Sequence, residues 1–122
     1  MDMEYRYKLL VESLRLLASS YEKQADYLPE FVVVQDEVVS LFSDAFLIVP
    51  QLIENNLLLN EAVASTIRCY NFMEMALRNQ ESPDEFKNKD SWNKVRELAS
   101  STLEKMGEEF KDPDLSFVDW VD

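Results

Sequence analysis

Residues 7–21 read YKLLVESLRLLASSY, a segment in which apolar side chains recur at intervals of three and four. The residues that follow this spacing are Tyr7, Leu10, Leu14, Leu17 and Tyr21, whereas Glu12, Arg15 and Glu22 fall outside it. Such spacing places one apolar stripe along an α-helix. The pattern therefore predicts an amphipathic helix over residues 3–24.

A connector and a second helix are expected next. Pro29 and the β-branched residues 32–34 indicate an extended connector over residues 27–35. Asp36 is expected to cap the second helix, whose apolar stripe is Val38, Phe42, Ala45, Val49 and Leu52. Pro50 lacks a backbone donor, which predicts a kink there, the alternative being a helix that restarts with Pro50 in its first turn. We expect this second helix to be the most buried one.

The spacing predicts a third helix over residues 61–79, with Asn60 as its cap. Its inward stripe is expected to be Val63, Ile67, Tyr70, Met73 and Leu77. Ser82, Pro83 and Glu85 then form a capping-box pattern with proline in the first turn. This pattern predicts a short helix that directs Phe86 inward.

A fourth helix is expected to start at a cap provided by Asp90 or Ser91. Its stripe comprises Trp92, Val95, Ala99, Thr102 and Met106. Gly107 is the only glycine of the chain and is well placed to end this helix. All-β and Rossmann-like folds depend on glycine in their turns and phosphate loops. We therefore predict an all-α, single-domain bundle of four main helices with a short extra helix, covering residues 1–122.

The tail over residues 108–122 alternates carboxylates with large apolar side chains and resembles neither a linker nor a helix. Phe117 and Trp120 admit two interpretations: they cover the bundle, or they project as anchors for another protein. We favour the first, because exposed aromatic side chains on a small domain promote aggregation.

The charge of the chain is strongly one-sided, with 12 basic and 24 acidic residues and a formal net charge of −12. No basic residue occurs between Lys23 and Arg68, an interval that holds the seven carboxylates Asp26, Glu30, Asp36, Glu37, Asp44, Glu54 and Glu61. Unneutralised carboxylates repel nucleic acid and anionic lipid and attract basic proteins. The interval predicts a protein partner and disfavours nucleic acid and membranes. A solvated surface that serves only solubility is the alternative.

Composition points to a soluble chain in the cytoplasm. Residues 1–7 lack the basic and apolar pattern of a secretory signal, and Cys69 has no partner for an internal disulfide. No apolar run approaches the roughly 18 residues of a membrane span. The oligomeric state stays open.

Catalysis, metals and cofactors are not expected. The chain has no histidine, which removes the usual general base and the commonest metal ligand. A carboxylate pair could act as acid and base, but the sequence singles out no pair. Asp112, Asp114 and Ser116 begin like a calcium loop, yet Phe117 occupies the position of its turn glycine. Cys69 is interpreted as a small buried hydrophobe.

Small, acidic, histidine-free helical chains of this size are similar in character to bacterial immunity proteins, which cover basic nuclease toxins with carboxylates. The Tyr-Tyr-Pro run of the colicin immunity family is absent, so no family residue is carried over to this chain. The resemblance implies a non-catalytic binding protein. Its candidate partner-binding residues are Asp26, Glu30, Asp36, Glu37, Asp44 and Glu54, together with Phe117 and Trp120.

A second hypothesis is an accessory or assembly module that binds through an apolar helix surface or the aromatic tail. In that case the negative charge serves solubility only.

Overall fold

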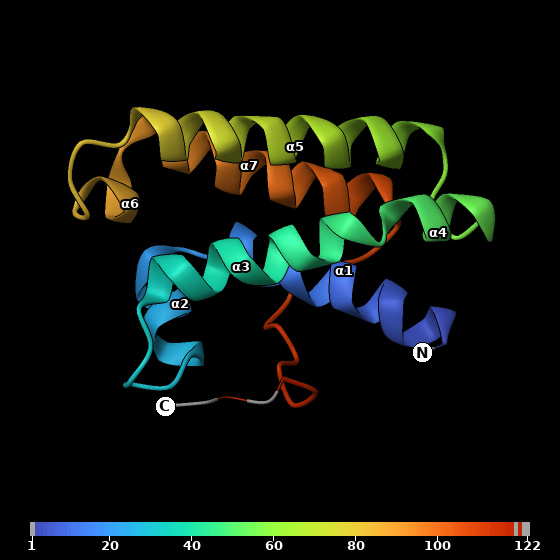
Figure 1. Ribbon diagram of the computed structural model, residues 1–122, viewed down its shortest axis with the longest axis horizontal. Helices are drawn as coiled ribbons and strands as arrows, with labels where there is room; N and C mark the ends of the chain where they lie inside the picture. The colour runs from blue at the N-terminus through green and yellow to red at the C-terminus, as the bar shows by residue number, and fades with distance from the viewer. Residues whose placement is uncertain (1, 119, 121–122) are drawn as a thin grey trace.

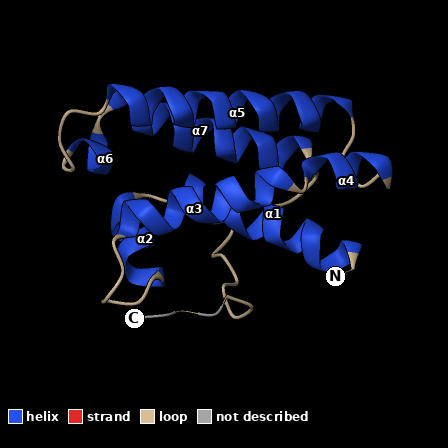
Figure 2. Ribbon diagram, in the orientation of Figure 1, coloured by secondary structure: helices blue, strands red, loops and turns tan. Residues whose placement is uncertain are grey.

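The computed structural model describes residues 2–118 and 120, and in this part of the chain it contains seven α-helices and no strand (Figure 1, Figure 2). Four helices are long: α1 (Met3–Ala18), α3 (Val34–Leu47), α5 (Asn60–Asn79) and α7 (Asp90–Lys105). Three are short: α2 (Tyr21–Tyr27), α4 (Val49–Glu54) and α6 (Glu85–Asn88). The all-α bundle of four main helices is confirmed, with three short helices beside them.

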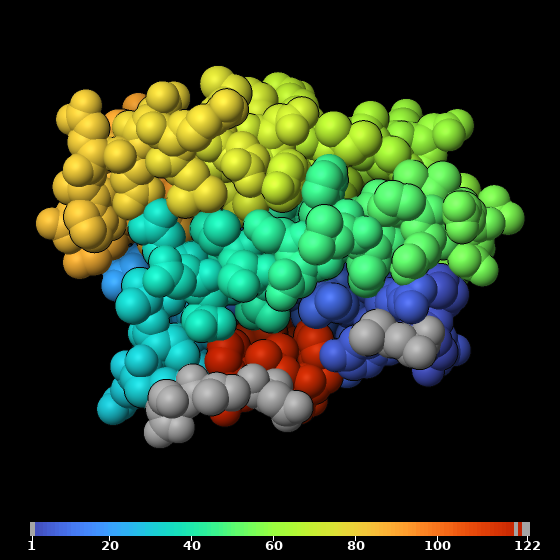
Figure 3. All heavy atoms as spheres, viewed as in Figure 1, coloured from blue at the N-terminus to red at the C-terminus, as the bar shows by residue number. Residues whose placement is uncertain are grey.

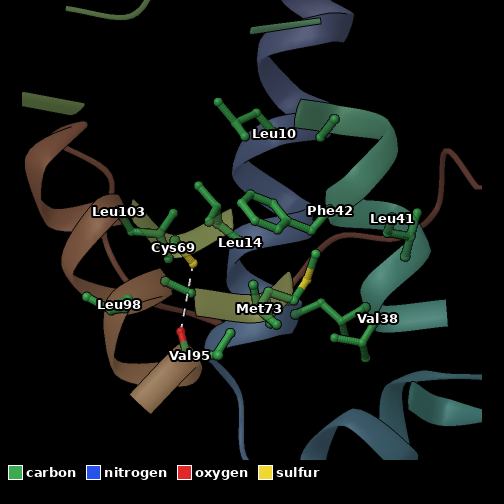
Figure 4. Close-up of a cluster of buried hydrophobic side chains, with 14 of the residues drawn as sticks. Leu10, Leu14, Val38, Leu41, Phe42, Cys69, Met73, Val95, Leu98 and Leu103 are labelled. Carbon is green, nitrogen blue, oxygen red and sulfur yellow. Dashed lines mark hydrogen bonds between the residues drawn. The ribbon is translucent and has the colours of Figure 1, made fainter. Parts of the chain in front are cut away.

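The long helices pack as antiparallel neighbours. α5 and α7 lie side by side, and α1 packs against both α7 and α3 (Figure 1). Every residue from Leu10 to Leu17 on α1 is buried, whereas α3 buries the single face formed by Val38, Leu41, Phe42 and Ala45. The central element is therefore α1, and the expectation that the second helix is the most buried is wrong. Figure 4 shows side chains of α1, α3, α5 and α7 meeting in this core.

The first helix is shorter than expected, because the helix is interrupted at Ser19 and Ser20. The Ser19 hydroxyl donates to the Arg15 carbonyl at 2.8 Å, and the Ser20 hydroxyl accepts from the Lys23 amide as N-cap of α2. Serine side chains that bond nearby backbone groups favour caps over helix interiors. The buried Gln24 then donates to the carbonyls of residues 16 and 17 at 3.0 and 3.3 Å, which satisfies the end of α1.

The second predicted helix is two helices. α3 begins at Val34 with Val33 as N-cap, so Asp36 lies in its first turn and does not cap it. The helix ends at Leu47, because its C-cap Ile48 has a φ of −98° and a ψ of 1°, outside the helical region, and Pro50 lies in the first turn of α4. Proline restarts the helix there, so the favoured kink is wrong and the alternative holds.

The third predicted helix has the expected bounds to within one residue but a different orientation. Asn60 is its first residue and Leu59 its N-cap. The buried face consists of Ala62, Ser65, Thr66, Cys69, Met73 and Ala76. Of the predicted stripe only Met73 is buried, while Val63, Tyr70 and Leu77 are half-buried and Ile67 is exposed. Two small residues of this buried face, Ser65 and Cys69, contact α7.

The C-terminal half follows its sequence signals at the end of α7 but not at the starts of α6 and α7. Glu85 accepts the amides of Glu81 and Ser82, both at 2.8 Å, and Phe86 is buried, as predicted, but the helix begins only at Glu85, with Asp84 as an N-cap that makes no side-chain bond. Neither Asp90 nor Ser91 caps α7, whose N-cap is Lys89. At the other end Gly107 has a φ of +76°, and the amides of residues 107 and 108 donate to carbonyls 104 and 103. This Schellman motif confirms Gly107 as the end of the helix.

Among the described residues, no helix combines the length and apolar character needed to cross a membrane.

Candidate protein-binding surface

The carboxylates of α2, the following loop and α3 form what we call the acidic surface: Asp26, Glu30, Asp36, Glu37 and Asp44. All are exposed except Glu37, which is half-buried. Asp36, Ser40 and Asp44 follow one another at four-residue spacing along the exposed face of α3. In the space-filling view, α2 and α3 form a band across the face toward the viewer, between α5 and the tail (Figure 3).

None of these carboxylates forms an ion pair with a described lysine or arginine. The ion pairs in the described part of the chain use carboxylates outside the interval, at residues 12, 84, 85, 97, 108, 109 and 114. No described cation from a distant segment therefore forms an ion pair that would compensate for the shortage of cations in this interval. Carboxylates left unpaired on a rigid surface sustain a negative potential.

The two remaining acids of the interval lie elsewhere. Glu54 is exposed at the last position of α4. Glu61 lies in the first turn of α5 and lines a surface depression of about 310 Å³ together with the cations Arg68 and Lys105. Five of the seven carboxylates therefore lie on α2, α3 and the loop between them, and the other two lie on α4 and α5.

The C-terminal tail folds back along α1. The Tyr7 hydroxyl donates to Glu108 at 2.9 Å, and the backbone amide of Asp114 donates to Glu12 at 2.8 Å. Phe117 is half-buried, with its ring edge-on to Tyr5 at 5.8 Å, and Trp120 is half-buried against the core. These contacts match the interpretation that the tail covers the bundle. Asp119, Val121 and Asp122 lie outside the described residues.

A buried ion pair within α1 also binds this tail, and it was not predicted from the sequence. Arg15 donates to Glu12 at 2.8 Å and to Glu108 at 3.4 Å, and its Nε donates to the carbonyl of residue 109. The Glu12 and Arg15 side chains are only 7% and 6% exposed. Both lie outside the apolar stripe of the sequence, so nothing local signalled their burial.

Asp112 and Asp114, which begin the pattern resembling a calcium-binding loop, form hydrogen bonds and an ion pair within the protein. Asp112 accepts the Tyr27 hydroxyl at 2.6 Å, which raises the pKa of Tyr27 to about 12. Asp114 accepts from Lys8 at 2.8 Å and from Ser116, and these bonds hold its pKa well below the usual value. No cluster of three or more potential metal-ligating side chains occurs within residues 2–118 and 120.

Cys69 lies at the buried contact of α5 with α7, where its Sγ is 3.8 Å from the carbonyl oxygen of Val95 (Figure 4). Burial raises the pKa of the thiol to about 12. The thiol therefore stays protonated, as expected for a small buried hydrophobe.

A second surface feature could not be predicted from the sequence, because it depends on which face of α5 is turned toward solvent. Ile53, Leu59, Val63 and Ile67 line a depression of about 430 Å³ where the loop from α4 meets α5. Its other lining residues are Asn56, Leu58, Asn60 and Ala64, so the lining carries no charge. Leu59 is 65% exposed and Ile67 is 42% exposed. We call this feature the apolar corner.

Comparisons with protein-family models, with curated proteins and with solved structures find no match for this chain.

Proposed function

We propose that this chain is a non-catalytic protein-binding domain whose acidic surface neutralises a basic protein partner, as an immunity or inhibitor protein does with a nuclease toxin. The contact is made by carboxylates of α2, the following loop and α3. A cytoplasmic location fits a chain whose one cysteine is buried and without a disulfide.

The observation that carries this proposal is the charge at the helix ends. α2, α3 and α4 hold Asp26, Asp44 and Glu54 in their last turns and no basic residue there. The other helices carry a cation at that position: Arg15, Arg78, Lys87 and Lys105. A carboxylate at a helix C-terminus interacts unfavourably with the helix dipole. Carboxylates retained in an unfavourable position support a role in binding rather than in folding.

The mechanism is electrostatic. Unpaired carboxylates speed encounter with a basic surface and then accept charge-assisted hydrogen bonds from its arginine and lysine side chains. Exposed charges are screened by salt, so the affinity should fall steeply as ionic strength rises.

The test compares the wild-type chain with the double variant Asp36→Lys/Asp44→Lys as baits on a column. Partners recovered by wild type should be basic, should elute with salt, and should be lost with the double variant. The matched control is Glu97→Lys/Glu104→Lys, which reverses two exposed carboxylates on α7. A partner that both double variants retain, and that salt does not elute, would refute the electrostatic mechanism.

A second candidate function, an assembly module that binds through apolar helix surface, is favoured by the apolar corner. Uncharged depressions lined by exposed large apolar side chains are typical of protein contacts. Ile67→Lys should then abolish a salt-resistant interaction that Asp36→Lys/Asp44→Lys leaves intact. If Ile67→Lys changes no interaction, this candidate is refuted.

A further inference from the structure

The loop between α2 and α3 exposes two large apolar side chains inside the acidic surface. Phe31 is 53% exposed and Val33 is 63% exposed. Glu30 precedes Phe31 directly, and Asp36 follows Val33 by three residues, which places it on the same side of the first turn of α3. Val33 thus extends the exposed stripe of Asp36, Ser40 and Asp44 at its N-terminal end.

The loop is fixed in place by its neighbours. Leu28 is buried, Val32 packs against the core, and the Val32 amide donates to the Pro29 carbonyl at 3.3 Å. Phe31 and Val33 therefore project from a preorganised support. Side chains held in one arrangement before binding lose little entropy on association.

Val33 also occupies a position where its residue type is unfavourable. It is the N-cap of α3, with extended φ and ψ of −83° and 115° and no side-chain capping bond. Serine, threonine, aspartate and asparagine are preferred there, because their oxygen accepts an amide of the first turn. An exposed valine contributes neither a cap nor core packing. A locally unfavourable residue that makes neither contribution is available for a role outside folding.

We infer that Phe31 and Val33 are the apolar anchors of the acidic surface, and that the partner is a protein with a small apolar pocket surrounded by lysine and arginine. The inference rests on the proposed function and specifies its partner. The charge of the surface argues for a basic partner. Four carboxylates lie within 11 residues of one another and form no ion pair with a described cation: Asp26, Glu30, Asp36 and Glu37. Lys87, which borders the depression beside Val33, is paired with Asp84 at 3.4 Å.

A second copy of this chain fits the loop poorly. A symmetric contact would bring the same carboxylates of both copies together, in a molecule with a net charge of −12. Anchors within a charged rim resemble the organisation of protein interfaces, where a few buried apolar side chains carry most of the affinity.

The test selects random peptides displayed on phage against the immobilised full chain. Recovered peptides should combine lysine or arginine with an aromatic residue or leucine. A synthetic copy of a recovered peptide should bind Phe31→Ser at least about ten-fold more weakly than wild type, and should bind Val33→Ser more weakly too. Glu30→Lys/Asp36→Lys should lower the affinity at low salt more than at high salt. Met75→Ser is the matched control, because Met75 is 48% exposed on α5, and it should leave the affinity unchanged.

Both loop variants should stay folded, since Phe31 and Val33 are exposed and the serine introduced by Val33→Ser would supply a cap; circular dichroism and thermal unfolding check this. Recovery of basic peptides that lack apolar residues and bind Phe31→Ser as well as wild type would refute the role of Phe31 and Val33 as anchors. It would remain consistent with the proposed function. Peptides without basic residues, or no enrichment at all, would overturn both. Self-association of wild type that Phe31→Ser abolishes would assign the loop to a second copy and overturn the inference.

Discussion

The hydroxyl oxygens of Ser65 and Thr102 lie 2.6 Å apart at the buried contact of α5 with α7. Thr102 donates its own proton to the Leu98 carbonyl at 2.8 Å, so Ser65 is the donor to Thr102. This contact lies on the face of α5 that is turned inward. It requires a small polar residue at position 65, and it leaves Ile67 on the outer side.

Ser65→Leu is expected to lower the free energy of unfolding by about 1–3 kcal/mol, because the larger side chain overpacks the contact. Ser65→Ala, which only removes the hydrogen bond, should cost about 1 kcal/mol. Asn71→Leu on the exposed face of α5 is the control and should stay within about 0.5 kcal/mol. Urea unfolding measures all three. Equal effects of Ser65→Leu and Asn71→Leu would contradict the packing described.

Leu59→Ser should raise the free energy of unfolding by about 1 kcal/mol. Leu59 is the N-cap of α5, with extended φ and ψ of −109° and 169° and no side-chain capping bond, and serine would supply that bond. Leu59→Ala removes the same apolar surface without adding a cap, so the difference between the two variants isolates the capping effect. Thermal or urea unfolding measures it. No gain of serine over alanine would show that the cap does not form.

Asp36 and Asp44 should respond to neutralisation with opposite signs. Asp36 lies in the first turn of α3, where negative charge is favourable, and Asp44 lies in the last turn, where it is not. Asp36→Asn should lower the free energy of unfolding by about 0.3–1 kcal/mol and Asp44→Asn should raise it by a similar amount, both at low salt. High salt should shrink both effects. A loss of stability in Asp44→Asn would refute the view that this carboxylate is kept for binding.

Replacing Arg15 alone should be strongly destabilising. Arg15→Leu leaves the Glu12 carboxylate buried without a cation, which costs about 3–5 kcal/mol. The double variant Glu12→Leu/Arg15→Leu should recover part of this loss, because no unpaired buried charge remains. A double-mutant cycle measured by urea unfolding tests the coupling. Purely additive losses would show that the two side chains do not act as a pair.

Alkaline conditions should weaken the contact of α1 with the tail. Burial and the hydrogen bond to Glu108 raise the pKa of Tyr7 from 10.0 to about 12. A group whose pKa is higher in the folded state stabilises the fold fully below its unfolded pKa and loses this contribution as pH rises through the folded value. Wild type should therefore lose stability between pH 10 and about 12 relative to Tyr7→Phe. Unfolding measured across that interval tests this, and parallel curves would contradict it.

The fold class was predictable because its signals are local. Apolar spacing identified the four main helices, and the φ of Gly107 is the one its position after the stripe predicted. Helix breaks were harder to predict. At residues 19–20 the serine pair ends α1 and caps α2, and Pro50 lies in the first turn of a new helix, so the apolar pattern continues across both breaks although the helix does not.

The candidate sites were predictable only in part. The shortage of cations between Lys23 and Arg68 was visible in the sequence, and it is what makes the acidic surface conspicuous. Phe31 and Val33 were not recognised, because a β-branched run beside a proline is equally typical of a buried connector. Their exposure depends on Leu28 and Val32 taking the inward positions of the same loop.

The sequence by itself determined the helical class, the end of α7 and the sign of the charge, because each follows from residues within a few positions of one another. Only the tertiary structure decided the rotation of α5, the burial of Glu12 with Arg15 and the absence of ion pairs between the acidic surface and the described lysines and arginines. Each of these depends on which side chains from distant helices meet. α5 has small residues on one side and large apolar residues on another, and packing against α7 selected the small side, since close approach of two backbones excludes larger side chains.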